Sequence, residues 1–593
     1  MNKRMNDSKT SLDKGVLVSQ GLFFAIVFGY FYFVANYVLY FQETQSLFIF
    51  SVDYLRQHLS KPGGPLAYGA EFLTQFYAGK LLGSLIVSVV LTLPGIVLYF
   101  IKDRLFPDIS VSWLFLLIPS CLLFLMQANY YHMMEYNLGF LLIMLYYLFS
   151  FSSGKTTRRI LVLILFPLFY YLAGAYVMIF AGMFVFHVLL LDEGKRKYVY
   201  ALLLLTIYVG SFLVFWKIVF FQSVRHIILF PLPQLDNAAH ITTFLILTGY
   251  MVSLPLLCRE VLQLFSNKWN NRVLSLMSKV VLLAIAIFLL FMEYDPRTAR
   301  VVELERAIYA EEWDEAIESQ EKSPSRDRIG QYFYNIALSE TDQLCDRLFY
   351  GVQDFGPGSL VLPWGVEHLN SGGYFYYAIG LVNEAHRWAY EEMVVYGYRP
   401  QNIKILTKTS LINGDVRMAR KYINILKRTV YYRDWAKDFE EMADNPDLMR
   451  SDPDLVRVLD ILPRSNFFIE YNQPESNLPL LLEAQPDNKR AFEYFLAGLL
   501  LTKNVEVAVN FIKEMKEAGY TRIPRHLEEA ALVYINSTSV FPDLGGLTIS
   551  SETQARFDQY SASYVQARTD LSTLRERMQA EFGNTFWFYY QFG

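Results

Sequence analysis

The sequence has 593 residues, of which 53% are hydrophobic, 16% aromatic and only 19% charged. Its mean hydropathy of +0.23 excludes a disordered or fibrous protein and predicts membrane spans. The net charge of −4 conceals a division: residues 1–293 carry 21 Lys and Arg against 13 Asp and Glu, whereas residues 294–593 carry 32 against 44. An acidic second half argues against nucleic-acid binding. Three widely separated cysteines exclude a disulfide scaffold or a cysteine-based zinc site.

Nine apolar runs in residues 1–293 are candidates for helices that cross the hydrocarbon core of a bilayer. The fifth and sixth belong to one apolar stretch of about 32 residues, which is too long for a single upright span, and we expect it to break near Gly174. The nine runs are Gly15–Phe41, Leu81–Ile101, Ser110–Ala128, Asn137–Phe151, Ile160–Leu172, Tyr176–Leu191, Tyr198–Phe221, Ile241–Leu257 and Leu274–Phe291.

The basic residues of this half are distributed unevenly over the loops between the runs. With nine spans and the amino terminus inside, sixteen Lys and Arg fall on the inner side and four on the outer side, as the positive-inside rule requires. A single span for the fifth and sixth runs would move the basic loop Arg259–Lys279 outside. The first run has no cleavage pattern and predicts a retained anchor. We therefore expect a multi-pass protein of the bacterial inner membrane, with a cytoplasmic amino terminus and residues 294–593 extracytoplasmic.

Residues 294–593 have the apolar period of amphipathic helices and contain a repeated helix–turn–helix pattern. Gly414 turns the chain before a helix in which the small Ala419 lets two helices approach, and Gly380 and Ala385 show the same pattern earlier. The two alanines are 34 residues apart, which is the period of tetratricopeptide repeats. Together with weaker copies at Glu311–Ile317 and Lys503–Ala508, they predict a stacked helical-repeat domain.

Three segments of this half differ from the repeat pattern. The loop Gly351–Gly373 is rich in glycine and cannot be helical throughout, and we expect a folded cap on the repeats rather than a ligand site. The segment Asn445–Asn488 contains six prolines and separates the last repeat from the earlier ones. The end, Phe586–Phe592, is too aromatic for a free tail, so we expect it to dock on the domain or at the membrane surface.

Several stretches of the second half together resemble a known family. They are Gly372–Tyr377, Asn383–Ala389, Asn413-Gly414, Leu426-Lys427 and Tyr432–Ala436. They are similar to an uncharacterised bacterial family of polytopic membrane proteins with a tetratricopeptide-like carboxy-terminal domain. The resemblance extends over most of the chain, including Phe50–Gly64. It implies the architecture alone, because the family carries no known activity.

Polar residues near the predicted outer ends of the spans are the candidates for chemistry. The first outer loop, Gln42–Gly79, carries Glu43 and Asp53 together with His58 and Glu71. Its layout is similar to that of membrane glycosyltransferases that use lipid-linked sugars, in which an acid on this loop acts as base or metal ligand.

On another outer loop, His132 and Glu135 lie one helical turn apart and can face one cavity. A carboxylate and an imidazole placed in this way can bind a divalent cation or accept a proton from an acceptor hydroxyl. The alternative is that these are ordinary polar residues of loops at a membrane edge.

The sequence contains no nucleotide-binding or hydrolase motif. Ion-coupled transport is disfavoured because Lys217 and His187 are the main ionisable candidates within the spans, each near a span end. We expect an all-α protein with a transmembrane domain at 1–293 and a helical-repeat domain at 294–593. The favoured function is a membrane-anchored scaffold for an extracytoplasmic protein or peptide, without a cofactor. The alternative is a glycosyltransferase with a lipid-linked sugar donor, an accessory repeat domain, an optional divalent cation, and Glu43, Asp53, His132 and Glu135 as its catalytic residues.

The charge asymmetry gives a first testable prediction, about topology. Alkaline phosphatase fused after Asp295 should be active, because this enzyme works only outside the cytoplasm, and the same fusion near Lys195 should be inactive. Enzyme activity in whole cells, normalised to the amount of fusion protein, measures both. The opposite pattern of activities would show that the predicted orientation is wrong.

Overall fold

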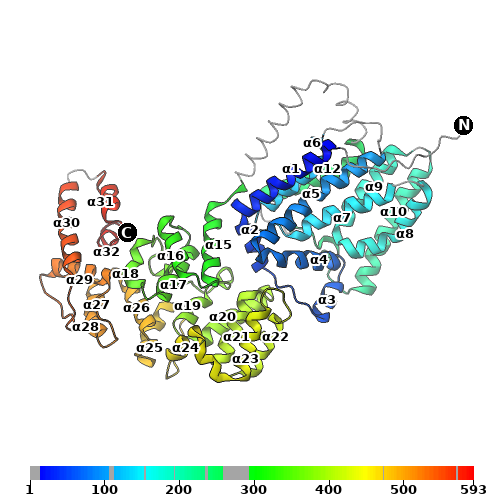
Figure 1. Ribbon diagram of the computed structural model, residues 1–593. Coiled ribbons are helices and arrows are strands. Elements are labelled where there is room, and N and C mark those ends of the chain that lie inside the picture. Colours follow the sequence, from blue (N-terminus) through cyan, green and yellow to red (C-terminus); the bar gives the residue numbers. More distant parts are fainter. Residues whose placement is uncertain are drawn as a thin grey trace. The chain divides into compact units, whose positions relative to one another are not determined.

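The computed structural model describes residues 14–105, 113–151, 155–192, 194–233, 238–257, 293–471, 473–568 and 572–593. In these ranges the regular elements are helices and no β-strand occurs, which confirms the predicted all-α class. The chain divides into two compact units, Met1–Asp295 and Pro296–Gly593 (Figure 1).

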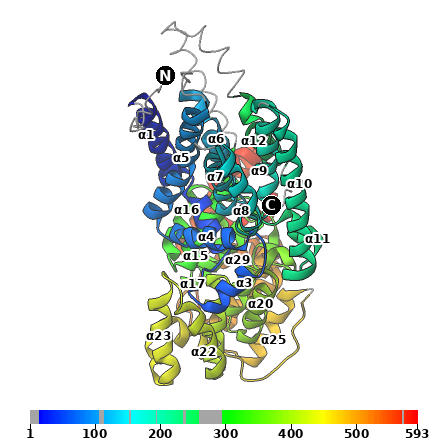
Figure 2. The same cartoon turned by 90° about the vertical axis from the view of Figure 1, so that its right-hand side faces the viewer.

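The amino-terminal unit is a bundle of apolar helices that lie side by side in Figures 1 and 2. Within the described ranges, four helical stretches are long and apolar enough to cross a membrane: Lys14–Val34, Lys80–Leu105, Thr157–Leu191 and Arg196–Val219. Three shorter apolar helices accompany them, Phe115–Gln127, Met134–Ser150 and His240–Leu256. The ninth predicted run, Leu274–Phe291, lies outside the described residues.

The helices of this unit have the following bounds. They are α1 (Lys14–Gly29), α2 (Asn36–Thr44), α3 (Val52–Leu59), α4 (Gly64–Thr74), α5 (Lys80–Leu105), α6 (Trp113–Gln127), α7 (Met134–Phe151), α8 (Lys155–Ala173), α9 (Val177–Leu191), α10 (Arg196–Val214), α11 (Val224–Leu229) and α12 (Ala238–Leu256). The first apolar run is not one helix to Phe41, because a π-helical turn at Tyr30–Val34 and a break at Ala35 separate α1 from α2. The predicted outer loop contains α3 and α4, and α4 packs against α7 and α8.

The long apolar stretch folds as two antiparallel helices, α8 and α9. Gly174 has a φ of +60° and starts the short 3₁₀ turn between them. A Cβ at this position would lie 2.4 Å from the carbonyl oxygen of Phe230, so the turn requires glycine. Arg159 near the start of α8 pairs with Asp192, which follows the end of α9, and this ion pair joins the open end of the hairpin. The predicted break near Gly174 is confirmed.

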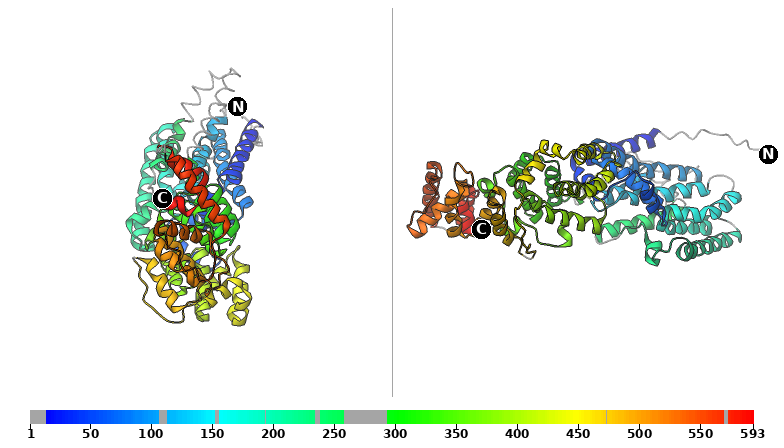
Figure 3. Two further views of the ribbon diagram at one scale, coloured as in Figure 1. Left: turned by 90° about the vertical axis from the view of Figure 1, so that its left-hand side faces the viewer. Right: turned by 90° about the horizontal axis from the view of Figure 1, so that it is seen from below.

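The carboxy-terminal unit consists of helical hairpins around a large apolar core (Figures 1 and 3). Its helices are α15 (Pro296–Tyr309), α16 (Trp313–Lys322), α17 (Arg328–Glu340), α18 (Leu344–Arg347), α19 (Gly373–Ala378), α20 (Val382–Tyr396), α21 (Pro400–Ile412), α22 (Val416–Leu426), α23 (Arg433–Asp444), α24 (Pro453–Asp460), α25 (Asn477–Ala484), α26 (Lys489–Leu501), α27 (Val505–Asn510), α28 (Ile512–Met515), α29 (Arg525–Thr538), α30 (Ser551–Ala567), α31 (Leu574–Phe582) and α32 (Phe586–Phe592).

Five helix junctions among the described residues of this unit share one turn geometry. In each, a residue with positive φ ends the first helix, and the next N–H donates to the carbonyl oxygen five residues earlier at 2.8–2.9 Å, which is the hydrogen bond of a Schellman motif. The residues with positive φ are Glu311, Asp342, Gly380, Gly414 and Lys503. Five positions later, four of the five hairpins have a buried alanine: Ala316, Ala385, Ala419 and Ala508. The weaker copies in the sequence thus have the same local structure as the two clear ones.

The glycine-rich loop packs as a cap on these hairpins. A Cβ on Gly372 would lie 2.4 Å from the ring of Trp388, so the loop backbone lies directly against that indole. Trp364 of the loop meets Trp388 edge-on, with ring centroids 4.6 Å apart. The guanidinium of Arg387 lies 4.5 Å from the ring of Trp364 and 4.1 Å from that of Tyr471, so α20 holds both irregular segments. This arrangement agrees with the expected cap.

Helix α24 covers α21 through a network of buried charges. Asp454 pairs with Lys408 of α21 at 2.8 Å and with Arg457, and it accepts a hydrogen bond from the hydroxyl of Tyr377. Burial alone would raise the pKa of Asp454, but the two cations hold it at about 2. The proline-rich segment that contains α24 is therefore an integral part of the unit.

The aromatic carboxy terminus docks on the unit, which is one of the two places expected for it. Phe586, Trp587 and Phe588 of α32 are buried. Glu529 of α29 accepts a hydrogen bond from the backbone N–H of Phe586 at 2.6 Å, and the indole N–H of Trp587 donates to the Glu529 carbonyl oxygen at 2.9 Å. The side chain of Glu529 also pairs with His526 at 2.9 Å, so one buried carboxylate ties α29 to the end of the chain.

The shared turn gives a prediction about stability. Ala419→Trp should lower the free energy of unfolding of residues 296–593, expressed alone, by about 1–3 kcal/mol, because the indole overfills a fully packed helix contact. Arg417→Trp, at an exposed position of the same helix, should change it by less than about 0.5 kcal/mol. Urea denaturation followed by circular dichroism measures both. Equal stability of the two variants would contradict the packing.

Candidate functional site

A chain of buried polar side chains links three helices and a loop of the amino-terminal unit. Gln42 of α2, Gln127 of α6, Asn137 of α7 and His132 in the loop before α7 are all essentially inaccessible to solvent. Gln127 donates to the Gln42 side chain at 3.0 Å, and Gln42 donates to the carbonyl oxygen of His132 at 2.6 Å. The imidazole of His132 lies 3.0 Å from the side-chain oxygen of Asn137 and 2.9 Å from Nε2 of His240 on α12.

The direction of this hydrogen-bond chain fixes the tautomer of His132. Because the Asn137 amide nitrogen donates to Gln127, its oxygen faces His132, and Nε2 of His132 must donate to it. The other nitrogen, Nδ1, then accepts from His240. Burial, followed by the neighbouring His240, lowers the pKa of His132 to about 3. His132 is neutral, with both ring nitrogens engaged.

A second polar cluster lies on the predicted outer loop. Nε2 of His58 on α3 lies 3.1 Å from a carboxylate oxygen of Glu71 on α4, and its Nδ1 lies 3.0 Å from the carbonyl oxygen of Tyr54. Burial lowers the pKa of His58, but Glu71 and this carbonyl outweigh burial, so the pKa lies above its ordinary value. The pair therefore stabilises the fold fully below a pH of about 6.5, and this contribution is lost as the pH rises through the raised pKa.

Glu135 belongs to this second cluster and not to the series of hydrogen-bonded side chains that includes His132. It interacts electrostatically with Lys61, Glu71 and His58. Lys61 also lies 4.0 Å from the ring of Phe230. Two carboxylates, one imidazole and one ammonium group thus gather where α3, α4 and α7 meet. This composition suits proton transfer or ion pairing.

The four residues predicted for catalysis therefore lie in different surroundings. Asp53 has a side chain that is 91% exposed and lies 3.8 Å from Arg56. Glu43 is buried on α2 beside Gln42, and His132 and Glu135 have different partners. Among the described residues, no three His, Cys, Asp or Glu side chains are grouped in a way that could hold a metal ion. Glu135 instead interacts electrostatically with Glu71, another carboxylate of the outer loop.

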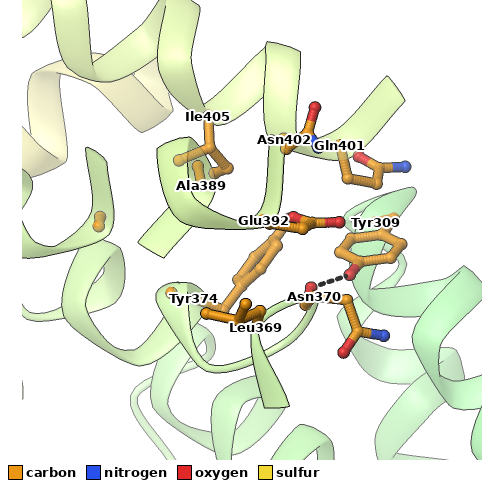
Figure 4. A pocket seen from close by; sticks show the side chains of 11 residues that line it. Tyr309, Leu369, Asn370, Tyr374, Ala389, Glu392, Gln401, Asn402 and Ile405 are labelled. Atoms are coloured by element: carbon orange, nitrogen blue, oxygen red, sulfur yellow. Dashed lines mark hydrogen bonds between the residues drawn. The ribbon is translucent and has the colours of Figure 1, made fainter. Parts of the chain in front are cut away.

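The carboxy-terminal unit has a small cavity between α15, α20 and α21, shown in Figure 4. Its volume of about 20 Å³ suffices for one water molecule. Glu392 faces the cavity next to Tyr309, whose hydroxyl donates to the carbonyl oxygen of Asn370 at 2.9 Å. Arg399 lies 3.5 Å from Glu392. Burial raises the pKa of Glu392 to about 7, against the effect of Arg399, so this group titrates near neutral pH.

Comparison with known proteins identifies the family of this chain but indicates no activity. The chain belongs to DUF6057, a family of unknown function, which matches residues 14–593. No curated protein and no solved structure matches the chain. The predicted resemblance to an uncharacterised family is confirmed.

The buried chain of hydrogen bonds gives a prediction about stability. Asn137→Leu leaves the acceptor of Gln127 and the donor of His132 without partners, and each such buried group costs about 1–3 kcal/mol. We expect a clearly lower midpoint of thermal unfolding for the full chain in detergent. Asp53→Asn is the control, because an exposed ion pair contributes at most about 1 kcal/mol. An Asn137→Leu variant as stable as the native protein would contradict the assigned bonds.

Proposed function

We propose that this member of the family is a nine-span protein of the bacterial inner membrane that carries a tetratricopeptide-like scaffold on its outer face. The scaffold binds an extracytoplasmic protein or peptide. The observation that carries this proposal is the repeated turn geometry of the carboxy-terminal unit, with its four buried alanines. Stacked helical repeats form extended surfaces that bind other proteins.

The membrane part of the proposal rests on the apolar helices and on charge. Four long apolar helical stretches and three shorter ones are compatible with membrane spans. The antiparallel arrangement of α8 and α9 supports counting the fifth and sixth runs separately, as the charge asymmetry also requires. With an odd number of spans and an inner amino terminus, the carboxy-terminal unit lies outside.

The polar residues of the amino-terminal unit favour a structural role over catalysis. A general base needs a free lone pair within reach of its substrate, and both nitrogens of His132 are engaged. Asp53 faces solvent. The buried chain instead satisfies its own members and ties α2, α6, α7 and α12 together.

One observation favours the alternative, a glycosyltransferase with a lipid-linked sugar donor. Glu71, His58 and Glu135 meet at one place, and a paired carboxylate and imidazole can transfer protons. In this case Glu71 has the role that we predicted for Glu43 or Asp53. The loss of a general base reduces the rate about 10²- to 10⁴-fold.

Photo-crosslinking in native membranes separates the scaffold from the enzyme. A photoreactive amino acid at Lys421, on the exposed side of α22, should give one discrete adduct with the full chain. Ala419→Trp should remove this adduct, because it disturbs the same helix. The adduct should persist in Glu43→Gln, Glu71→Gln and Glu135→Gln, which leave the repeats unchanged.

Complementation of a deletion strain tests the enzyme alternative. If the protein is an enzyme, Glu71→Gln or Glu135→Gln should abolish complementation at a normal protein level, whereas Ala419→Trp should be tolerated. That pattern would replace the scaffold with the glycosyltransferase alternative.

A further inference from the structure

Few side chains fasten helix α3 to the rest of the amino-terminal unit. Of its eight residues, Val52–Leu59, only His58 is buried, and Tyr54 is half-buried. Helix α4 is its neighbour in Figure 1, and both side chains reach the same carboxylate oxygen on that helix. The hydroxyl of Tyr54 donates to Glu71, and Nε2 of His58 lies 3.1 Å from it. A helix with so few buried contacts lies at the low end of the local stabilities within a fold.

The chain is held in place on both sides of α3. Before the helix, the side chains of Leu47–Ile49 are buried. After it, Gly63 has a φ of +78°, and its N–H donates to the carbonyl oxygen of Tyr171 at 2.8 Å. The segment between these two fixed points, residues 50–62, consists mainly of α3. A movement of α3 can therefore be confined to this segment while α4 stays in place.

The surroundings of His58 require the charged form of its side chain. Nδ1 lies 3.0 Å from the carbonyl oxygen of Tyr54, and Nε2 lies 3.1 Å from the carboxylate oxygen of Glu71 that also accepts from the Tyr54 hydroxyl. Both oxygens are acceptors, so each ring nitrogen must carry a proton. Either neutral tautomer would point a lone pair at one of these oxygens, in a residue that is only 7% exposed. A protonated His58 therefore fits the position of α3 on α4, and a neutral one does not.

Ionisable groups from several elements surround His58 and act on its charge in opposite directions. They are Tyr54 on its own helix, Glu71 and Tyr68 on α4, Lys61 in the turn between the two helices, and Glu135 at the start of α7. Burial disfavours the cation most strongly, and Lys61 also disfavours it. The bonds to Glu71 and to the Tyr54 carbonyl outweigh both, so the pKa of His58 lies above its ordinary value. His58 therefore loses its proton above a pH of about 6.5.

We propose that α3 is a proton-controlled lid, which lies on α4 while His58 is protonated and detaches when His58 loses its proton. One proton is enough, because its loss removes a hydrogen bond and the charge attraction to Glu71 together. The detached helix takes both of its donors away from Glu71 and opens this carboxylate to solvent. The lid is thus closed at low pH and open at high pH. This inference goes beyond the proposed scaffold and does not depend on how the unit is oriented in a membrane.

Hydrogen–deuterium exchange of the full chain in detergent micelles, read by mass spectrometry, tests this proposal. Exchange is measured at about pH 5.5 and about pH 8.5, and each rate is divided by the intrinsic rate of an unfolded amide at that pH. A helix of eight residues is unstable by itself in water, so detachment exposes its amides. We expect the protection of α3 to be about ten-fold or more lower at the higher pH, and that of α4 to change by less than about two-fold.

Substitutions identify the group that carries the proton. His58→Gln is neutral at every pH, so α3 should be weakly protected at both pH values. Arg56→Gln removes an exposed charge from the same helix and should keep the pH dependence of the native chain. Tyr171→Phe removes only the hydrogen bond from its hydroxyl to the carbonyl oxygen of Leu59, so it should lower the protection of α3 at both pH values and leave the pH dependence in place.

Three results would overturn the proposal. The first is equal protection of α3 at both pH values in the native chain, a measurement that needs no variant to fold. The second is a parallel loss of protection in α4, because the whole loop would then unfold and α3 would not move separately. The third is a His58→Gln variant in which α3 keeps the native pH dependence, because the proton would then belong to another group.

Discussion

A polar group buried among apolar helices has no water to bond, so it must find its partner within the protein. This constraint organises the amino-terminal unit. Gln42, Gln127, Asn137 and His132 satisfy one another in a directed chain that ends at a backbone carbonyl. The same constraint explains the Arg159–Asp192 pair at the open end of the α8–α9 hairpin. The polar residues hold the helices of this unit in one arrangement, which is why we assign them to structure before chemistry.

The carboxy-terminal unit is subject to a different constraint. Its chain reverses direction repeatedly while neighbouring helices remain closely packed. A left-handed residue closes five of the turns, and in four of these hairpins an alanine five positions later removes the bulk that would separate the helices. Gly380 and Gly414 adopt this conformation without strain, whereas Glu311, Asp342 and Lys503 adopt it as side-chain-bearing residues. The turn geometry is therefore set by the hydrogen bonds and the packing of the hairpins, and glycine is helpful but not required.

The features that the sequence predicted are those that depend on local patterns. The helical class, the break at Gly174 and the docking of the last aromatic residues follow from apolar periodicity, from glycine and from composition. The polar chain was not predicted, because the bonds that connect Gln42 with Gln127 and His132 with His240 join residues 85 and 108 positions apart, and sequence spacing says nothing about such pairs. Glu71 and His58 were visible on the same loop as Asp53, but choosing them requires knowing that α3 and α4 fold against each other. The prediction of Glu43 and Asp53 as the loop carboxylates rested on an analogy of layout.

We propose that the amino-terminal unit is embedded in the membrane and that the carboxy-terminal unit lies on its outer side. Labelling of single cysteines in intact cells tests this directly, in a variant whose native cysteines are replaced by serine. A membrane-impermeant maleimide should label Glu552→Cys without permeabilisation and Arg196→Cys only after it, because both positions are exposed but lie on opposite predicted sides. Labelling of Arg196→Cys in intact cells, with Glu552→Cys protected until the cells are permeabilised, would contradict this orientation in the membrane.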